Sequence, residues 1–350
     1  MRVRVDDDVF TQAADTAMDL VELLNMGRHK RHRILLGPPP HDNYTQWTAA
    51  RSLVERELFK SILEQCLDAE SRTPAELGIR IVTDARATAG ADPAFLLHDA
   101  LHLLRAPFRV VLENHLNDRA FLLAAASEED RAVLEQAEEY QWLRFDNGGG
   151  LEGIVSMLAA HTPGGLASER SRLRAFILFD SDRLAPDTEA KKSDPLARQC
   201  SACGLDLPRR YHQLRRRAIE NYLPLEALDR WKQSPKGRPD RPAVVDAWRK
   251  LSPLQAHHFN MKNGFDRDRP RYTRELPAEK QCERGGKQYP HLYEDVPEPV
   301  LLALHSGFAE DIGKDFKTNI AWYTANPSWR HRAGVADEVD ELLDALLGVM

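Results

Sequence analysis

The sequence predicts an α/β protein whose central part is a parallel β-sheet flanked by helices. Short apolar segments alternate with helical ones from Phe108 onward, a pattern typical of parallel strands joined by crossover helices. The expected strands are nearly continuous apolar runs, as in sheets covered on both faces. Three of these segments, 108–113, 175–182 and 212–220, end in acidic residues.

The N-terminal part, residues 1–105, is expected to be an α/β extension that adds strands to this sheet. Apolar residues at helical spacing predict helices over 9–27, 47–67 and 94–104, and short apolar runs predict strands over 32–37 and 79–83. Three prolines follow the first of these strands without a Gly-Lys-Ser/Thr sequence, so this turn is not a nucleotide-binding P-loop.

The central unit, residues 106–230, carries the clearest alternation. Strands are expected over 108–113, 140–146, 174–180 and 212–220, and helices over 118–126 and 151–160. The polar segment 183–208 is interpreted as a loop.

The C-terminal part, residues 231–350, is expected to be rich in loops and short helices. Helical patterns cover 242–251, 300–320 and 335–347, the last being amphipathic. Positive charge gathers over 205–290, which holds 20 Lys and Arg against 11 Asp and Glu, although the whole chain has a net charge of −6. A basic segment beside an acidic cluster suits an enzyme that acts on a polyanion, but a solvated loop region of mixed charge is a fair alternative.

The bulk composition fits a cytoplasmic protein without a membrane partner. Hydrophobic residues make up 42% of 350, and no apolar run approaches the ~20 residues that span a bilayer. The first residues lack the apolar region of a signal peptide, and four cysteines do not make a disulfide scaffold.

The acidic residues at the strand ends predict a metal centre. The carboxyl ends of parallel strands meet at one edge of a sheet, and carboxylates gathered there repel one another unless a cation holds them. Carboxylate oxygens suit Mg²⁺ or Mn²⁺, and two ions about 4 Å apart are typical of phosphodiester hydrolysis. The candidate ligands are Glu113, Asp118, Asp180, Asp182 and Glu220.

Each carboxylate also has a plainer interpretation. Asp180 and Asp182 are expected to share one face if their strand persists, because side chains repeat every two residues. Glu113 is a ligand or the base that takes a proton from water. Asp118 is equally an N-cap residue of the next helix, and Glu220 equally a partner for Arg215 or Arg217.

The central unit resembles a Toprim domain, the metal-binding fold of topoisomerases, primases and OLD-type nucleases. The resemblance covers roughly residues 105–230 and consists of Glu113, the turn Gly148-Gly149-Gly150, and Asp180-Ser181-Asp182. The run Arg217-Ala218-Ile219-Glu220-Asn221-Tyr222-Leu223 is similar to a segment of OLD-like and stand-alone Toprim proteins. The sequence departs from the family at Asn114, where a glycine is usual, and at Asp118, which comes one position late.

The resemblance implies a Mg²⁺- or Mn²⁺-dependent nuclease acting on DNA or RNA, in the branch of the family that includes phage-defence proteins. The chain has no Walker A sequence, so any ATPase of the OLD type would be a separate partner. The alternative is a non-catalytic Toprim-like platform that binds such an ATPase.

Further residues are candidates for binding. Arg215, Arg217 and Lys262 are candidate phosphate contacts, with ordinary surface roles left open. The turn Gly148–Gly150 either brings backbone N–H groups to a phosphate or is merely a tight connection. A structural zinc site at Cys200 and Cys203, completed by His212 and Cys282, is the less favoured interpretation because the spacing is irregular.

Overall fold

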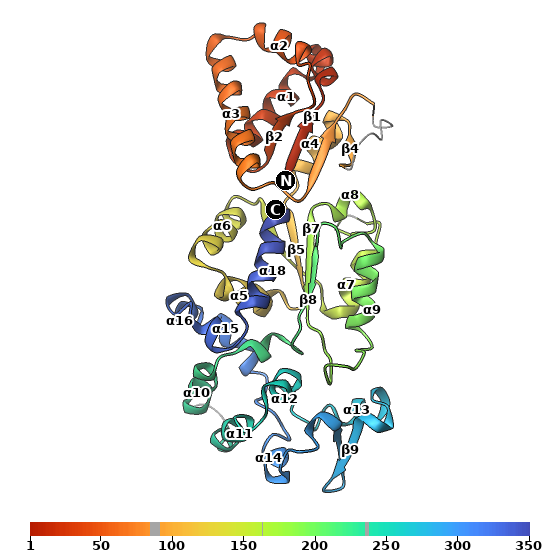
Figure 1. Ribbon diagram of the computed structural model, residues 1–350, viewed down its shortest axis with the longest axis vertical. Helices are drawn as coiled ribbons and strands as arrows, with labels where there is room; N and C mark the ends of the chain where they lie inside the picture. The colour runs from red at the N-terminus through yellow and green to blue at the C-terminus, as the bar shows by residue number, and fades with distance from the viewer. Residues whose placement is uncertain (85–91, 163, 235–237) are drawn as a thin grey trace.

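The computed structural model describes residues 1–350 except 85–91, 163 and 235–237. Two four-stranded parallel sheets, each flanked by helices, lie one above the other, and a mostly helical region follows below (Figure 1). The strands are β1 (Arg2–Val5), β2 (Arg33–Leu36), β3 (Gly78–Ile81), β4 (Ala94–Phe95), β5 (Phe108–Leu112), β6 (Leu143–Asn147), β7 (Ala175–Phe179), β8 (Tyr211–Gln213), β9 (Gln281–Arg284) and β10 (Lys287–Pro290).

The N-terminal strands form a sheet of their own, in the order β2-β1-β3-β4. The expectation that they extend the central sheet is therefore wrong. Two strands were not expected: β1, and β4, which lies where the helix over 94–104 was predicted to begin. β1 pairs with both β2 and β3, and β3 pairs with β4, so these strands satisfy their backbone hydrogen bonds among themselves. The helices of this unit are α1 (Ala13–Arg28), α2 (Asp42–Ala49), α3 (Leu53–Arg72) and α4 (Leu97–Arg105).

The second sheet has the order β6-β5-β7-β8, with all strands parallel. Alternate residues of β7 enter different cores: Phe176 and Leu178 pack in the larger one, and Ile177 and Phe179 in another. Burial on both faces explains the continuous apolar run in the sequence. The surrounding helices are α5 (His115–Ala125), α6 (Glu128–Glu139), α7 (Gly150–Ala159), α8 (Glu169–Arg172) and α9 (Ser193–Ala202).

Two expected elements of the central unit are wrong. The strand predicted over 212–220 ends at Gln213, and residues Ile219–Tyr222 form a 3-10 helix, η2. This short helix is fixed by tertiary bonds, because the Arg217 amide donates to His257 O at 3.0 Å and the Ile219 amide donates to Asp180 Oδ1 at 3.2 Å.

The segment 183–208, expected to be a loop, contains the helix α9. Leu196 and Cys200 are its fully buried apolar residues, spaced four apart, and they pack against β7. One narrow apolar stripe was too weak a signal among the polar residues around it.

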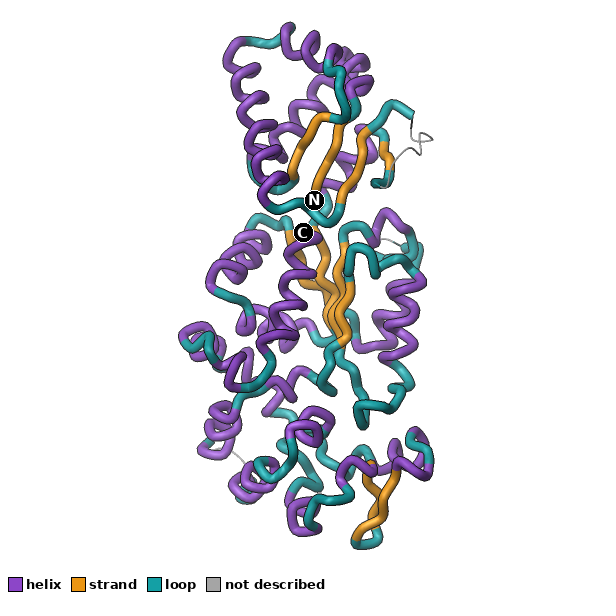
Figure 2. The backbone as a smooth tube through the Cα atoms, viewed as in Figure 1, coloured by secondary structure: helices purple, strands orange, loops and turns teal. Residues whose placement is uncertain are grey.

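The C-terminal region consists mainly of short helices and loops, with the β9–β10 hairpin as its described sheet (Figure 2). The last helix, α18, corresponds to the predicted amphipathic segment and lies against the second sheet (Figure 1). In the described part of the chain, no helix is both long and apolar enough to cross a membrane. The helices are α10 (Leu225–Gln233), α11 (Arg241–Trp248), α12 (Pro253–His258), α13 (Arg269–Glu275), α14 (Glu298–Ala303), α15 (Asp315–Thr318), α16 (Ile320–Ala325), α17 (Trp329–Arg332) and α18 (Ala336–Val349).

Candidate active site

The candidate site lies at the carboxyl ends of β5 and β7. The chain moves from β5 to β6 on one side and then crosses to β7 on the other, so β5 and β7 flank the topological switch point. Glu113 follows β5 and Asp180 follows β7. The Asp180 amide lies 3.4 Å from Oε2 of Glu113 and donates to it, so the two predicted residues are neighbours.

The charges of neighbouring predicted carboxylates help to raise the pKa values of Glu113, Asp118 and Asp180. Burial, followed by the charge of Asp182, raises the pKa of Glu113 to about 7. Burial, with the charges of Glu113 and Glu220, raises the pKa of Asp118 to about 8. Burial and the four other carboxylates hold the pKa of Asp180 well above its ordinary value. The five residues thus form one electrostatic cluster.

Asp118 is not the N-cap that the sequence left open, because Asn114 has that position, but it does support the start of α5. Its Oδ2 accepts from the Asn114 amide at 2.7 Å, and Asn114 caps the start of α5. The residue therefore stabilises the first turn of α5 while lying at the edge of the cluster.

A turn, and not a continuing strand, places Asp182 in the cluster. The strand β7 ends at Phe179, and Asp182 has a left-handed backbone with φ of 54°. The strand does not persist, so the expectation that period-two alternation aligns Asp180 and Asp182 is wrong. The turn is fixed by the Asp182 amide, which donates to Arg217 O at 2.9 Å.

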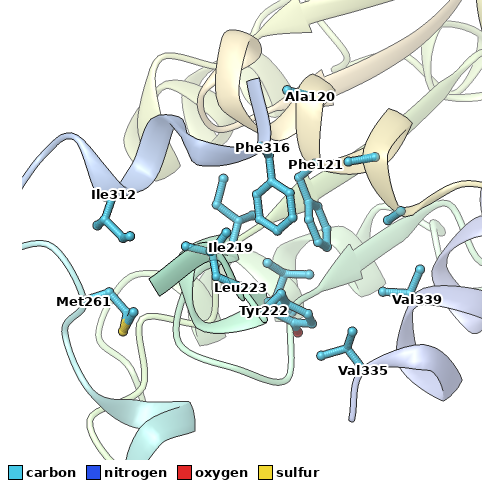
Figure 3. Packing of buried hydrophobic residues seen from close by; sticks show 14 of the residues in the cluster. Ala120, Phe121, Ile219, Tyr222, Leu223, Met261, Ile312, Phe316, Val335 and Val339 are labelled. Atoms are coloured by element: carbon cyan, nitrogen blue, oxygen red, sulfur yellow. The ribbon is translucent and has the colours of Figure 1, made fainter. Parts of the chain in front are cut away.

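Glu220 lies on η2 and is buried, with Lys262 as its counter-charge. The Lys262 ammonium nitrogen is 2.8 Å from Oε1 of Glu220. The apolar neighbours Ile219, Tyr222 and Leu223 pack near Phe121 and Phe316 (Figure 3). The apolar residues of the run thus anchor η2 in the core, and the anchored helix holds Glu220 in place.

The glycine turn lies beside the same strand ends. The Gly150 amide donates to Glu113 O at 3.2 Å, and Gly149 and Gly150 have φ of 71° and 81°. Open space surrounds the positions that a Cβ would occupy on either residue, whereas a Cβ on Gly148 would meet Cγ1 of Ile154 at 2.5 Å. The turn begins α7, whose first backbone N–H groups therefore lie near Glu113.

The predicted phosphate-binding arginines contact protein groups instead. Arg217 is buried in an ion pair with Asp268 at 2.5 Å. Arg215 is half-exposed and pairs with Glu341 of α18. Both side chains hold the C-terminal region against the second sheet, a role that the local sequence did not indicate.

The residues considered for zinc do not come together. Cys200 and Cys203 lie at the end of α9, whereas Cys282 lies on β9, and His212 directs its Nε2 to Glu338 at 3.2 Å. More generally, within the described residues, no three His, Cys, Asp or Glu side chains stand together as a ready-made set of metal ligands.

The N-terminal sheet offers a contrast, because it has the same relative strand order and acidic residues after its first strand. There Asp6 pairs with Arg80 at 2.5 Å, and Asp7 accepts from the Asn43 and Tyr44 amides at 3.0 and 2.9 Å. Asp8 accepts from the Thr83 hydroxyl. The carboxylates of the second sheet also have partners, namely backbone amides and Lys262. They differ in that burial and the charges of neighbouring acids raise the pKa values of Glu113, Asp118 and Asp180.

The chain matches no known family model, no curated protein and no solved structure in the comparisons. The functional argument therefore depends on the geometry of the site and on the sequence pattern.

Proposed function

We propose that the chain is a metal-dependent phosphodiesterase that hydrolyses DNA or RNA through a Toprim-like carboxylate cluster. The observation that carries the proposal is the convergence of Glu113, Asp180 and Asp182 at the switch point of a parallel sheet, with Glu220 beside them. The raised pKa values of Glu113 and Asp180 in one place favour a functional site over a structural one.

The donor chemistry fits a hard divalent cation. Each candidate ligand offers carboxylate oxygens, which Mg²⁺ and Mn²⁺ prefer. Oε1 of Glu220 is buried, and its counter-charge is the Lys262 ammonium nitrogen at 2.8 Å. Because the described side chains form no ready-made ligand set, the proposal requires Glu113, Asp180 and Asp182 to turn towards a cation as it binds.

The cation, the carboxylates and the positively charged or N–H donors would have different roles in the proposed hydrolysis. A bound divalent cation supplies Lewis-acid stabilisation of the phosphate and lowers the pKa of a bound water. Glu113, with its pKa near 7, is suited to be a ligand or to take the proton of the attacking water. Lys262, which also pairs with Glu220, and the backbone N–H groups of α7 that follow Gly150 are the donors that would hold the phosphate.

The second candidate is a non-catalytic platform for a separate ATPase. Two observations favour it: the absence of a ready-made ligand set among the described residues, and Asn114 in place of the usual glycine. Titration with Mn²⁺ distinguishes the candidates, because a platform need not bind metal at these carboxylates.

The test is cleavage of a panel of plasmid, linear DNA, single strands and tRNA in Mg²⁺, Mn²⁺ or EDTA. The variant is Asp180→Ala/Asp182→Ala, and the control is Asp344→Ala, an exposed acid on α18. Metal-dependent cleavage that only the double variant loses supports the nuclease and identifies its substrate. No cleavage by folded, metal-saturated protein contradicts a self-sufficient nuclease and directs attention to a partner.

A role in phage defence is proposed from the Toprim resemblance alone. Its test is the resistance to phage of cells that carry the gene with its genomic neighbours. Resistance lost in the double variant supports the role, and unchanged sensitivity to a broad phage panel argues against it.

A further inference from the structure

Asp182 has a backbone conformation that it does not favour by itself. Its φ of 54° lies in the left-handed region, which residues with a Cβ disfavour and which Asp adopts only as a single residue in turns. Such conformations persist only where surrounding contacts fix them. The neighbouring contacts should therefore reveal what holds this carboxylate at the site.

The residue is held on both sides of its backbone. Its amide donates to Arg217 O at 2.9 Å, and its carbonyl accepts from Nη2 of Arg271 at 3.2 Å. Arg217 belongs to the segment after β8, and Arg271 belongs to α13. Two segments far from Asp182 in sequence thus fix one turn.

Arg217 is itself immobilised by the C-terminal region. Its guanidinium pairs with Asp268 at 2.5 Å, and both side chains are about 95% buried. Its amide donates to His257 O and its Nη1 donates to His258 O, at 3.0 and 3.3 Å. Asp268 also accepts from Asn260 at 3.2 Å. A chain of contacts therefore links the loop region 257–271 to the backbone of Asp182.

We infer that Arg217, Asp268 and Arg271 are positioning residues, which hold Asp182 within the carboxylate cluster. The basic C-terminal region thereby completes the site instead of serving only as a surface for a polyanion. The consequence for metal binding rests on the proposed function, whereas the positioning of Asp182 does not. A merely structural role would affect stability without a specific effect at Asp182.

The chain offers a matched pair of variants on α13. Arg271 and Arg274 both pair with Glu275, at 3.3 and 3.0 Å, but Arg271 also contacts Asp182. Arg271→Ala is the test and Arg274→Ala is the control. Arg271→Lys restores one charged donor. Asp268→Asn removes the negative charge that pairs with Arg217.

Two measurements on the full chain decide the inference. The first is hydrogen exchange of the peptide that carries the Asp182 amide, followed by mass spectrometry in EDTA. We expect exchange about tenfold faster in Arg271→Ala and in Asp268→Asn, because a charge-assisted bond that holds the turn is weakened. Arg274→Ala should match the unaltered protein, and Arg271→Lys should recover part of the protection.

The second measurement is Mn²⁺ affinity by calorimetry. We expect the dissociation constant to rise about tenfold in Arg271→Ala, as is typical when a group supporting a ligand is lost. If Arg271→Ala and Asp268→Asn leave exchange at Asp182 unchanged relative to Arg274→Ala, the inference is wrong. If the unaltered chain binds no Mn²⁺, the proposed function fails, and the exchange measurement still decides the positioning role.

Discussion

The ammonium nitrogen of Lys262 lies 2.8 Å from Oε1 of Glu220, a side chain only 2% exposed. The contact joins the C-terminal region to η2 and neutralises the most buried of the candidate acids. Gly313 packs on the same pair, because a Cβ there would lie 2.7 Å from Oε1 of Glu220.

Removing this counter-charge should destabilise the metal-free protein strongly. We expect Lys262→Met to lower the free energy of unfolding by about 3–5 kcal/mol, because a buried carboxylate loses its partner. Added Mn²⁺ should restore part of the loss if the cluster binds it. Urea unfolding with and without Mn²⁺ measures both effects. The control is Lys280→Met, whose partner Asp187 is exposed and whose loss should cost at most about 1 kcal/mol. Equal losses in the two variants would contradict the role of burial.

The raised pKa values predict how stability depends on pH in EDTA. The folded protein keeps the protons of Glu113 and Asp118 up to pH values of about 7 and 8, whereas the unfolded chain releases them near pH 4. The contribution of these groups to stability is therefore fully present below about pH 4 and is lost as pH rises through 7 to 8. Urea unfolding from pH 5 to 9 should show this decline.

The variant Glu113→Gln/Asp118→Asn should lessen that decline, because its two altered side chains do not titrate, while Asp180, whose pKa is also raised, still contributes. Glu129→Gln, an exposed acid of α6, serves as the control and should leave the slope unchanged. A steep decline that persists in the double variant would assign the pH dependence to other groups.

The glycine turn should be important for activity beyond its effect on stability. Gly149 and Gly164 both have left-handed backbones and open space where a Cβ would lie. Each change to Ala should therefore cost about 1–2 kcal/mol of stability. We expect only Gly149→Ala to reduce cleavage, by about tenfold or more, because it alters the start of α7 next to Glu113. Equal activity of the two variants would make the turn purely structural.

Arg215 should contribute little to nucleic-acid binding. It already pairs with Glu341 and remains half-exposed, so Arg215→Ala should change stability by no more than about 1 kcal/mol. The salt dependence of nucleic-acid affinity should stay the same. If Arg215→Ala instead lowers the slope of that dependence by about one, Arg215 is restored as a phosphate contact.

The local pattern was sufficient to predict Glu113 and Asp180 as neighbours, because strand order fixes which strand ends meet. It could not predict how Asp182 turns, since a left-handed residue after β7 depends on Arg217 and Arg271. Nor could it predict the partners of the arginines, because Arg215 and Glu341 are 126 positions apart.

The fold was predicted where segments are long or continuously apolar, as in β5, β7 and α18. It was missed at β1, where four residues alternate Arg and Val, and at α9, where one narrow stripe is buried. The acids after β1 resemble a metal site in sequence, yet Arg80 neutralises Asp6. Whether a carboxylate is available for function is decided by its tertiary partners.

The contacts of Glu220 and Asp182 have a consequence for protein synthesis. A ribosome delivers residues 113–220 before it delivers Lys262, Asp268 and Arg271, and domains fold as they emerge. The carboxylates are therefore synthesised before the three residues that hold them in position. The proposed hydrolytic activity would begin only after the later segment has emerged and docked.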